Sequence, residues 1–290
     1  MPKQGKKRPS RLTLERESKL HALLPGWNED DRLEASGVVA LGESRCYVAF
    51  DNLNRLASIH TSLEDPSSNR LVDAPSPGPG FEDIAFDSAE RRFHLLVEAM
   101  RDADGASRAR VVELDEDLTF RGCSVLDRPF ECENRGFEGL EHVRLGEREF
   151  LWALCEGNLC SDARAGGGRI HVFERAADES WTWSHELALP AAARFEDYSA
   201  IAIEAGRVAV VSQRSARLWV GRLDASGEGF EAGGSVYRFP KGEKYCNVEG
   251  VSWLSEDRLL MVSDRKKRNQ DVACAARDQS IHVFALPQST

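Results

Sequence analysis

Five polar residues recur at the same position of a repeated pattern, and each carries an oxygen that can bind a cation. In every repeat the polar residue is followed by a small or acidic residue and then by alternating apolar residues. The segments are ASGVVAL from Ala35, FEDIAFD from Phe81, FEGLEHV from Phe137, YSAIAIE from Tyr198 and VEGVSWL from Val248. The recurring residues, called the anchors below, are Ser36, Glu82, Glu138, Ser199 and Glu249. Hard oxygen ligands in irregular geometry are what Ca²⁺ accepts, so converging anchors would form a Ca²⁺ site.

Carboxylates at three of the anchors would repel one another strongly if they met in a channel of low dielectric constant. A bound cation, raised pKa values or water must offset that repulsion. We expect a cation, because buried charges are usually paired or bound to metal. The alternative is that the carboxylates cap backbone N–H groups of neighbouring structural units. The anchors are thus the predicted metal ligands, with Ca²⁺ preferred to Mg²⁺, which demands a tight octahedron.

The spacing of the anchors indicates the fold that would position them. They are separated by 46, 56, 61 and 50 residues, and 41 residues follow the last one. Each anchor segment is followed by two further strand-like runs, as in RRFHLLVE (91–98) and RARVVELD (108–115). Repeats of this length and rhythm are typical of propeller blades. The sequence therefore predicts an all-β, five-bladed β-propeller with four-stranded antiparallel blades, whose innermost strands carry the anchors along a central channel.

The N-terminal segment SRLTLERE (10–17) alternates apolar and polar residues, as a strand with one buried face does. The last repeat runs out after its third strand, so we expect this N-terminal strand to complete the last blade and close the ring. An amphipathic helix through Leu12, Leu14 and Leu20 is the alternative. The predicted domain organisation is a basic disordered tail at 1–9 and a single propeller domain at 10–290.

A second set of polar residues ends the second strand of each repeat, and basic residues follow it closely. If these strands run away from the anchors' end, the set gathers at one mouth of the channel. Arginines beside bound cations suit phosphate or carboxylate groups, so the predicted partner is a small anionic, phosphate-bearing ligand. The candidates for a general base are Asp51, Glu98 and Glu156, and those for neutralising charge are Arg217 and Arg265. The alternative is that these residues are solvated loop charges.

Composition limits the kinds of partner that the protein can bind and the cellular compartment in which we expect it. The 290 residues carry a formal net charge of -10, which argues against nucleic acid, because phosphate backbones require clustered positive charge. No apolar run approaches the roughly 20 residues that span a bilayer, and no apolar segment follows the basic N-terminus. We therefore expect a cytoplasmic protein with no membrane partner. Its seven cysteines, an odd number, are expected to be buried free thiols in a reducing compartment.

The segments FEDIAFD, FEGLEHV and VEGVSWL resemble the blade-start motifs of the esterase-like phytase propellers. The cyclic order of serine and glutamate at the anchors also resembles the calcium-activated nucleotidases, or apyrases. That resemblance implies one Ca²⁺ on the axis, held by the five anchors, and it places Asp51 near the phosphates of a nucleotide. The chain departs from the nucleotidases at EAMRDADG (98–105), where they have segments rich in Trp, Gly and Lys.

These features favour a Ca²⁺-dependent phosphoesterase or related hydrolase. A non-catalytic propeller, in which a structural axial Ca²⁺ supports a binding or scaffold module, is the first alternative. Hydrolysis of a lactone or ester over a channel calcium is another, but neither His60 nor His94 is obviously placed as its base. We expect His94 and His142 to occupy core or solvent positions.

Overall fold

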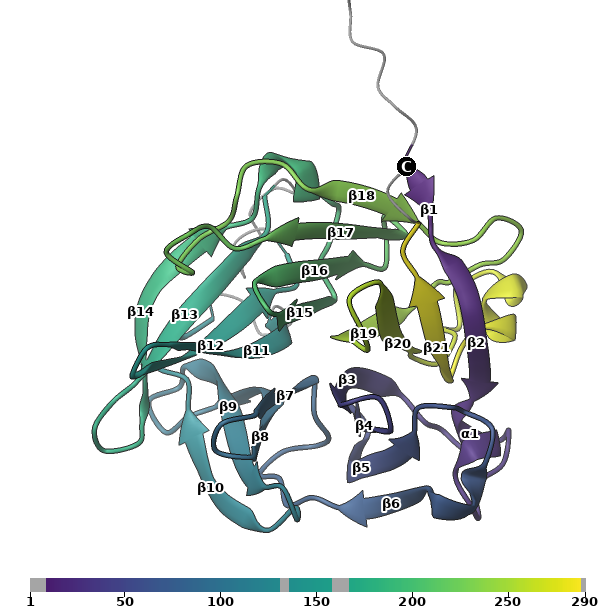
Figure 1. The fold of residues 1–290 in the computed structure, drawn as a ribbon. Helices are drawn as coiled ribbons and strands as arrows, with labels where there is room; N and C mark the ends of the chain where they lie inside the picture. The colour runs from purple at the N-terminus through teal and green to yellow at the C-terminus, as the bar shows by residue number, and fades with distance from the viewer. Residues whose placement is uncertain (1–8, 131–135, 158–166, 288–290) are drawn as a thin grey trace, which may run out of the picture.

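The computed structural model describes residues 9–130, 136–157 and 167–287, and the backbone alone of Glu98. Its strands form five sheets around a central axis (Figure 1), which confirms the predicted five-bladed β-propeller. In each blade the strand that carries or directly follows an anchor lies innermost, and the innermost strands contact one another around the ring. The anchors therefore stand on the axis side of the blades, as the repeat predicts.

The elements follow the chain in the order of the repeats. Blade 1 comprises β3 (Ala35–Leu41), β4 (Arg45–Phe50), β5 (Leu53–His60) and β6 (Arg70–Asp73). Blade 2 comprises β7 (Asp83–Asp87), β8 (Arg92–Arg101), β9 (Ser107–Asp115) and β10 (Phe120–Val125). Blade 3 comprises β11 (Phe137–Leu145), β12 (Arg148–Cys155), β13 (Arg169–Arg175) and β14 (Trp181–Ala188). Blade 4 comprises β15 (Ala200–Glu204), β16 (Arg207–Ser212), β17 (Arg217–Arg222) and β18 (Ser235–Arg238), with β1 (Ser10–Arg11) beyond it. Blade 5 comprises β19 (Val248–Trp253), β20 (Arg258–Ser263), β21 (Ser280–Ala285) and β2 (Thr13–Lys19). The short helices are α1 (Leu20–Leu23), η1 (Pro66–Ser68), η2 (Ala191–Ala193) and η3 (Val272–Ala276).

The N-terminal segment closes the ring as a strand, so the prediction of closure is confirmed and the helical alternative is wrong. Strand β2 pairs antiparallel with β21, from Thr13 opposite Ala285 to Lys19 opposite Ser280. The two residues of β1 also pair in parallel with β18 of blade 4, a contact that the sequence does not predict. One N-terminal segment therefore joins two neighbouring blades (Figure 1). The tail boundary at 1–9 falls almost wholly outside the described residues, and the single domain stays a prediction.

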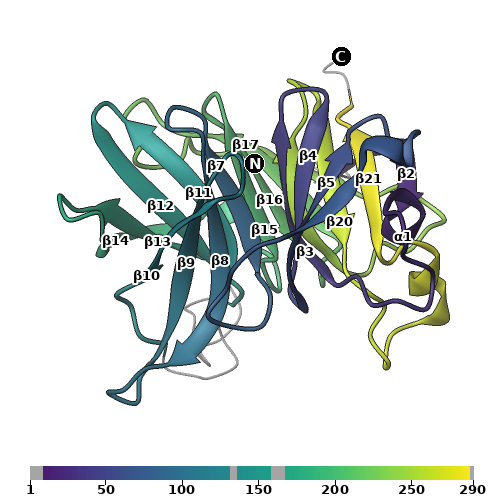
Figure 2. The same ribbon diagram turned by 90° about the horizontal axis from the view of Figure 1, so that it is seen from below.

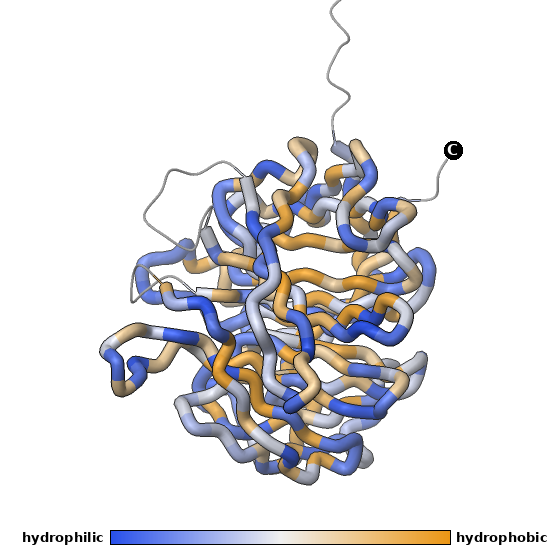
Figure 3. Tube along the Cα trace, turned by 90° about the vertical axis from the view of Figure 1, so that its left-hand side faces the viewer, coloured by the Kyte–Doolittle hydropathy of each residue, from blue (hydrophilic) through white to orange (hydrophobic). Residues whose placement is uncertain are grey.

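The apolar core lies between blades, where the face of one sheet packs on the next. Each of the five buried clusters draws on two neighbouring blades, as where Phe50 and Val48 of blade 1 pack with Val262 and Val283 of blade 5. Figure 3 shows apolar residues along the strands and polar residues in the loops at the blade ends. Figure 2 views the same ring from its edge, with the strands running between two ends that carry the loops. The apolar core therefore packs neighbouring blades against each other, and the polar loops lie at the two ends of the ring.

The residue after four of the five anchors is Gly or Ala, and Asp83 after Glu82 is the exception. At Gly37 and Gly250 the small residue is needed because the inner strands approach closely at the axis. A Cβ atom on Gly37 would lie 2.7 Å from Cα of Asp83 and 2.9 Å from the backbone nitrogen of Ile84. A Cβ atom on Gly250 would lie 3.0 Å from Cα of Gly37. The pattern of anchor followed by small residue is thus a consequence of packing around the axis.

Replacing Gly37 with Ala is expected to destabilise the protein by about 1–3 kcal/mol, the usual cost of overpacking a well-packed interior. The added methyl group meets backbone atoms of blade 2, which cannot move aside as a flexible side chain can. Urea denaturation measures the change, and Gly122→Ala is the control, because a methyl group added at Gly122 would meet nothing within 4 Å. Equal stability of the two variants would contradict close packing of the inner strands.

The expectation of free thiols is wrong for several cysteines. Cys246 and Cys274 form a disulfide with a Cα–Cα distance of 5.6 Å, and Cys155 is disulfide-bonded as well. Cys46 is a buried free thiol, as expected, whereas Cys123 is free but exposed. Cys132 and Cys160 lie outside the described residues. Because disulfides persist mainly in oxidising compartments, the cysteines no longer support the cytoplasmic expectation, which stays a prediction.

Candidate functional site

The second strands return to the anchors' end of the blades, so the condition that they run away from it is not met. The backbone N–H of Asp51 donates to the carbonyl of Glu34 (2.9 Å), just before the anchor Ser36. Likewise, Asp264 donates to Asn247 (2.8 Å), two residues before the anchor Glu249. Antiparallel pairing within each inner hairpin causes this return. The anchors and the second polar set therefore share one mouth of the channel, here called the anchor mouth.

The glutamate anchors influence one another electrostatically, as expected from their equivalent positions. Burial, followed by the charges of Glu82, Glu156 and Glu249, raises the pKa of Glu138 well above its ordinary value. Burial, followed by the charge of Asp264, raises the pKa of Glu249 in the same direction. Burial is the largest cause of both shifts, and repulsion between neighbouring carboxylates adds to it. A cation at the anchor mouth would relieve the repulsion.

One cation in the chain already reaches this ring. The Nζ atom of Lys267 lies 3.5 Å from Oε1 of Glu249 and 4.0 Å from Oδ2 of Asp264. These two carboxylates, Glu249 first, raise the pKa of Lys267. The lysine side chain is 54% exposed, so it approaches the acids from the solvent side. In the sequence Lys267 lies in the basic run RKKR (265–268), one of the basic groups that follow the second strands, for which solvated loop charge was the alternative.

The two serine anchors bond to the following blade. The hydroxyl of Ser36 donates to the carbonyl of Phe81 (2.5 Å), and that of Ser199 donates to the carbonyl of Val248 (2.8 Å). In both cases the acceptor is the residue just before the next glutamate anchor. The serines thus position Glu82 and Glu249 through the backbone, and their role as Ca²⁺ ligands stays a prediction.

The alternative role considered for the anchors, capping N–H groups of neighbouring blades, is filled by other carboxylates. Asp83 accepts from the backbone N–H of Leu140 (2.7 Å), and Glu141 accepts from that of Ile203 (2.9 Å). Burial raises the pKa of Asp83 well above its ordinary value and raises that of Glu141 to about 8. Both lie one to three residues beyond an anchor, where the sequence pattern gave no separate signal for them.

An acidic pair lies beside the glutamate ring at the anchor mouth. Burial, then the charges of Asp264 and Glu34, raise the pKa of Asp51 to about 7. Burial is also the largest cause that raises the pKa of Asp264 to about 6. The Oδ1 atom of Asp51 is buried and has no hydrogen-bond partner in the described part of the chain. A carboxyl group that titrates near neutral pH is suited to proton transfer, in line with the predicted role of Asp51.

Replacing Asp51 with Asn is expected to stabilise the protein at pH 8 and to change little near pH 4. The folded pKa of about 7 exceeds the ordinary 3.8, so folding takes up a proton between these values. Stability therefore falls as pH rises through this window, and the penalty is complete above it. We expect Asn to raise the melting temperature at pH 8 by about 2–4 °C, corresponding to roughly 1 kcal/mol for a partly screened carboxylate.

Thermal denaturation of wild type and variant between pH 4 and pH 8 measures this effect. The control is Asp30→Asn, at an exposed position. A variant that keeps the wild-type dependence on pH would show that Asp51 titrates normally.

A cavity of about 790 Å³ opens beside the anchor mouth between blades 4 and 5. Lys267 and Glu156 are among its lining residues, together with Tyr245 from the segment that joins β18 to β19. The hydroxyl of Tyr245 is buried and lacks a hydrogen-bond partner among the residues described. Other lining cations are Arg11, Arg214, Arg217, Arg238 and Lys244.

Three of these cations form a row across adjacent strands, here called the arginine row. Arg238 on β18 is opposite Arg11 on β1 and opposite Arg217 on β17. Burial, then the charges of Arg238 and Arg11, lower the pKa of Arg217. Arg11 and Arg217 donate to backbone carbonyls, and the buried Nε of Arg238 has no partner in the described segments. Within the described ranges, none of the three guanidinium groups forms an ion pair with a carboxylate, a charge pattern that suits an anion.

The structure brings some predicted catalytic residues to the cavity and leaves others away from it. Glu156 and Arg217 line it, whereas Asp51 is not among the lining residues and lies close enough to Asp264 for that charge to raise its pKa. The side chain of Arg265 does not line it, and the backbone N–H of this residue donates to Asp264. The side chain of Glu98 lies outside what the structure describes.

Comparison with known proteins shows the fold and nothing finer. The sequence matches no protein-family model and no curated protein. Among solved structures, the fold is similar to Myxococcus xanthus glutaminyl cyclase, with a TM-score of 0.53, 11% identity and coverage of 97% of this chain and 100% of that one. It is also similar to PQQ-bound aldose sugar dehydrogenase from Streptomyces coelicolor, with a TM-score of 0.52, 13% identity and coverage of 93% and 98%. Regucalcin from Agrobacterium tumefaciens gives a TM-score of 0.50, 13% identity and coverage of 89% and 91%.

These similar structures are β-propeller proteins, and they do not confirm the finer resemblance to phytases or nucleotidases. In the residues that the structure describes, no helix is long and apolar enough to cross a membrane.

Proposed function

We propose that this propeller is a divalent-cation-dependent hydrolase, of the phosphoesterase type, that acts on a small phosphate-bearing anion at the anchor mouth. The observation that carries the proposal is the meeting of two opposite charge patterns at one mouth. Carboxylates with raised pKa values surround the axis, and the arginine row lines the adjoining cavity. A cation and a phosphate group placed side by side would neutralise both.

The donor set fits Ca²⁺ in chemistry. Glu82, Glu138 and Glu249 offer only oxygen ligands, and a cation would offset the repulsion that, after burial, raises the pKa values of Glu138 and Glu249. Regucalcin, one of the proteins with a similar fold, is described as a calcium-binding protein, which supports the fold as a host for this ion. These glutamates would hold the ion, and the ion would polarise a phosphoryl oxygen.

The protein's own groups supply the remaining functions. Arg217 and Arg238 would donate to the phosphate oxygens, with Arg11 at the end of the row, and so orient the substrate in the cavity. Asp51, with a pKa of about 7, would accept a proton from the attacking water. Glu156 lines the cavity and is the second candidate for that role.

A specific contact favours the second candidate function, a non-catalytic propeller that binds an anion. Lys267 lies within 3.5 Å of Glu249 and thus supplies a cation to the acidic ring without any metal. In that case the ring has a structural role and the arginine row alone binds the ligand.

Calorimetric titration with inorganic phosphate and pyrophosphate tests the anion site. We expect Arg238→Gln and Arg217→Gln to weaken binding about 10- to 100-fold each, as expected for the loss of a hydrogen bond to a charged group. Arg222→Gln, at the exposed far end of β17, is the matched control and should bind like the wild type. Equal affinity in all variants would disprove the arginine row as the anion site.

A panel of phosphate monoesters, diesters and anhydrides, assayed with Ca²⁺ and with chelator, tests the hydrolase. Turnover that requires Ca²⁺ and falls in Asp51→Asn supports the proposal. Phosphate binding without turnover of any panel member would replace the hydrolase with the non-catalytic candidate.

A further inference from the structure

A second polar cluster lies at the opposite end of the blades from the anchors. Asp87 is the last residue of β7 in blade 2, while His142 on β11 and Glu149 on β12 belong to blade 3. On the inner strands, Asp87 follows the anchor Glu82 by five residues, which is about 16 Å of extended chain. The cluster is therefore separate from the anchor mouth.

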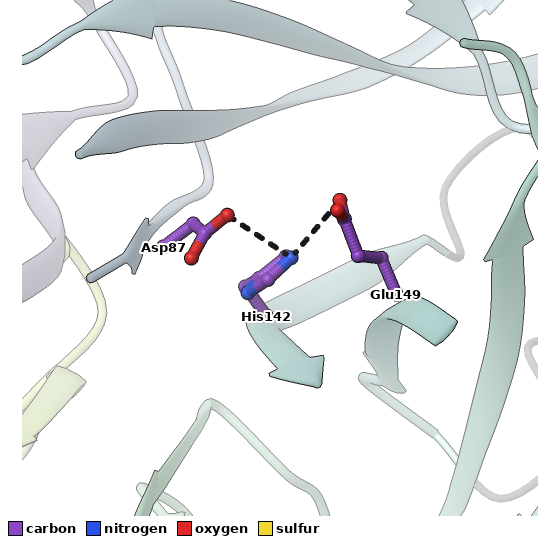
Figure 4. A group of neighbouring side chains, drawn as sticks. All are labelled: Asp87, His142 and Glu149. Atoms are coloured by element: carbon purple, nitrogen blue, oxygen red, sulfur yellow. Dashed lines mark ion pairs between the residues drawn. The ribbon is translucent and has the colours of Figure 1, made fainter. Parts of the chain in front are cut away.

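The three side chains converge on one point. Both carboxylates point toward the imidazole of His142 (Figure 4), whose Nε2 lies 3.8 Å from Oδ2 of Asp87 and 3.7 Å from Oε2 of Glu149. Two ligands bound at about 2.0–2.2 Å to a tetrahedral ion are roughly 3.3–3.6 Å apart, so small movements would seat such an ion. Among the described residues, this is the one group of three His, Cys, Asp or Glu side chains whose ligand atoms all lie within 4.8 Å.

The imidazole nitrogen that faces the carboxylates is buried, and its contacts with them are longer than a hydrogen bond. The His142 side chain is 4% exposed, and its Nε2 has no hydrogen-bond partner in the described residues. The ring is held in this orientation by His94, which stacks on it at 5.2 Å with an interplanar angle of 3°. Trp181 packs edge-on against both rings. A nitrogen that is held in place between two carboxylates and makes no hydrogen bond can coordinate a cation without rearrangement of its ring.

A guanidinium group occupies the outer side of the cluster. The Nη2 atom of Arg144 lies 2.9 Å from Oδ2 of Asp87 and 2.8 Å from Oε1 of Glu149. The Arg144 side chain is 30% exposed, so solvent is available to it if an ion displaces it. Arg144 thus neutralises the carboxylates in the absence of an ion, but it leaves the imidazole nitrogen without a partner.

We propose that Asp87, His142 and Glu149 form a binding site for a first-row divalent transition-metal ion, with Zn²⁺ as the expected occupant, which enters by displacing Arg144. One imidazole nitrogen and two carboxylate oxygens suit such an ion better than Ca²⁺ or Mg²⁺, which prefer oxygen alone. Because the ligands come from two blades, the ion would clamp blade 2 to blade 3. This inference is independent of the proposed function.

Calorimetric titration of chelator-treated protein with ZnCl₂ tests the site, and Co²⁺ absorption reports the coordination geometry. We expect His142→Gln to weaken Zn²⁺ binding at least tenfold and His185→Gln, on the outermost strand of blade 3, to leave it unchanged. Asp87→Asn, which keeps the shape of the side chain, should weaken binding similarly and serves if His142→Gln does not fold.

Arg144→Gln separates a metal site from a simple ion-pair cluster. Removal of a competing cation should tighten Zn²⁺ binding, whereas an ion-pair cluster would only lose stability and gain no affinity. Glu138→Gln, at the anchor mouth, should leave Zn²⁺ binding intact. Absence of Zn²⁺ binding in the wild type, equal affinity in His142→Gln, or unchanged or weaker affinity in Arg144→Gln would each overturn the proposal.

Discussion

Deletion of residues 1–18 is expected to lower the melting temperature by about 10 °C or more, because several kcal/mol of packing and pairing are lost. The deletion removes all but one residue of β2 and leaves the edge of β21 without a partner. It also removes Leu12, which is 3% exposed and packs in the core between blades 4 and 5. The hydrogen bond between Oε2 of Glu17 and Nδ1 of the buried His282 (2.8 Å) is lost as well.

Differential scanning calorimetry of the truncated and full-length chains measures this loss. Deletion of residues 1–8 is the control, since the sequence predicts a tail there, and it should leave the melting temperature within about 2 °C of wild type, as for a change that removes no packed residue. A chain shortened by 18 residues that melts like the full-length protein would show that closure by β2 contributes little.

Addition of Ca²⁺ is expected to raise the melting temperature, and Glu138→Gln is expected to reduce that rise. At a Ca²⁺ concentration about 100 times the dissociation constant, binding stabilises the folded state by about 2.7 kcal/mol. In chelator at pH 8, the variant should melt no lower than wild type, because burial, followed by repulsion from neighbouring carboxylates, raises the pKa of Glu138 and the uncharged Gln escapes both penalties. The order of the two proteins therefore reverses between chelator and Ca²⁺.

Glu204→Gln is the control for this reversal, because Glu204 pairs with Arg207 at the far end of β15 (2.9 Å). It should respond to Ca²⁺ like the wild type. If neither Ca²⁺ nor chelator changes the melting temperature of the wild type, the axial calcium site is wrong and Lys267 is the cation that neutralises the ring. The hydrolase proposal then loses its metal, although the arginine row could still bind phosphate.

The repeat predicted the blades because the inner strand of each blade packs against its neighbours around the axis in a similar way. The anchor and the small residue after it, as in Ser36–Gly37 and Glu249–Gly250, are local patterns that a reader of the sequence can align. The strand at 13–19 was predictable for a similar reason, since alternation of apolar residues reports one buried face.

The arginine row in the cavity could not be predicted in the same way. Arg11, Arg238 and Arg217 are adjacent only because β1 crosses to blade 4 and pairs with β18. No sequence pattern sets that register, which results from how the ring closes. The direction of the second strands, in contrast, follows from the antiparallel pairing that the sequence predicts.

The cluster opposite the anchors was missed for a different reason. His142 and Asp87 come from different blades, and each alone fits a core or surface position. They lie close together only because blade 2 packs on blade 3. That packing involves residues far apart in the sequence, so no local pattern reports it. The disulfide between Cys246 and Cys274 was not predicted either, because a separation of 28 residues matches no short cysteine spacing.

Closure by one segment that pairs with both blade 4 and blade 5 also governs how the chain can fold. Thr13 finds its partner Ala285 only after the intervening blades exist, so these contacts have very long sequence separation. Contacts of that kind form late and slow the search for the native state. Until they form, β18 and β21 present open edges that can pair with another copy of the chain. Refolding should therefore yield less native protein at high concentration, and a synthetic peptide spanning residues 9–19 should rescue the chain that lacks them.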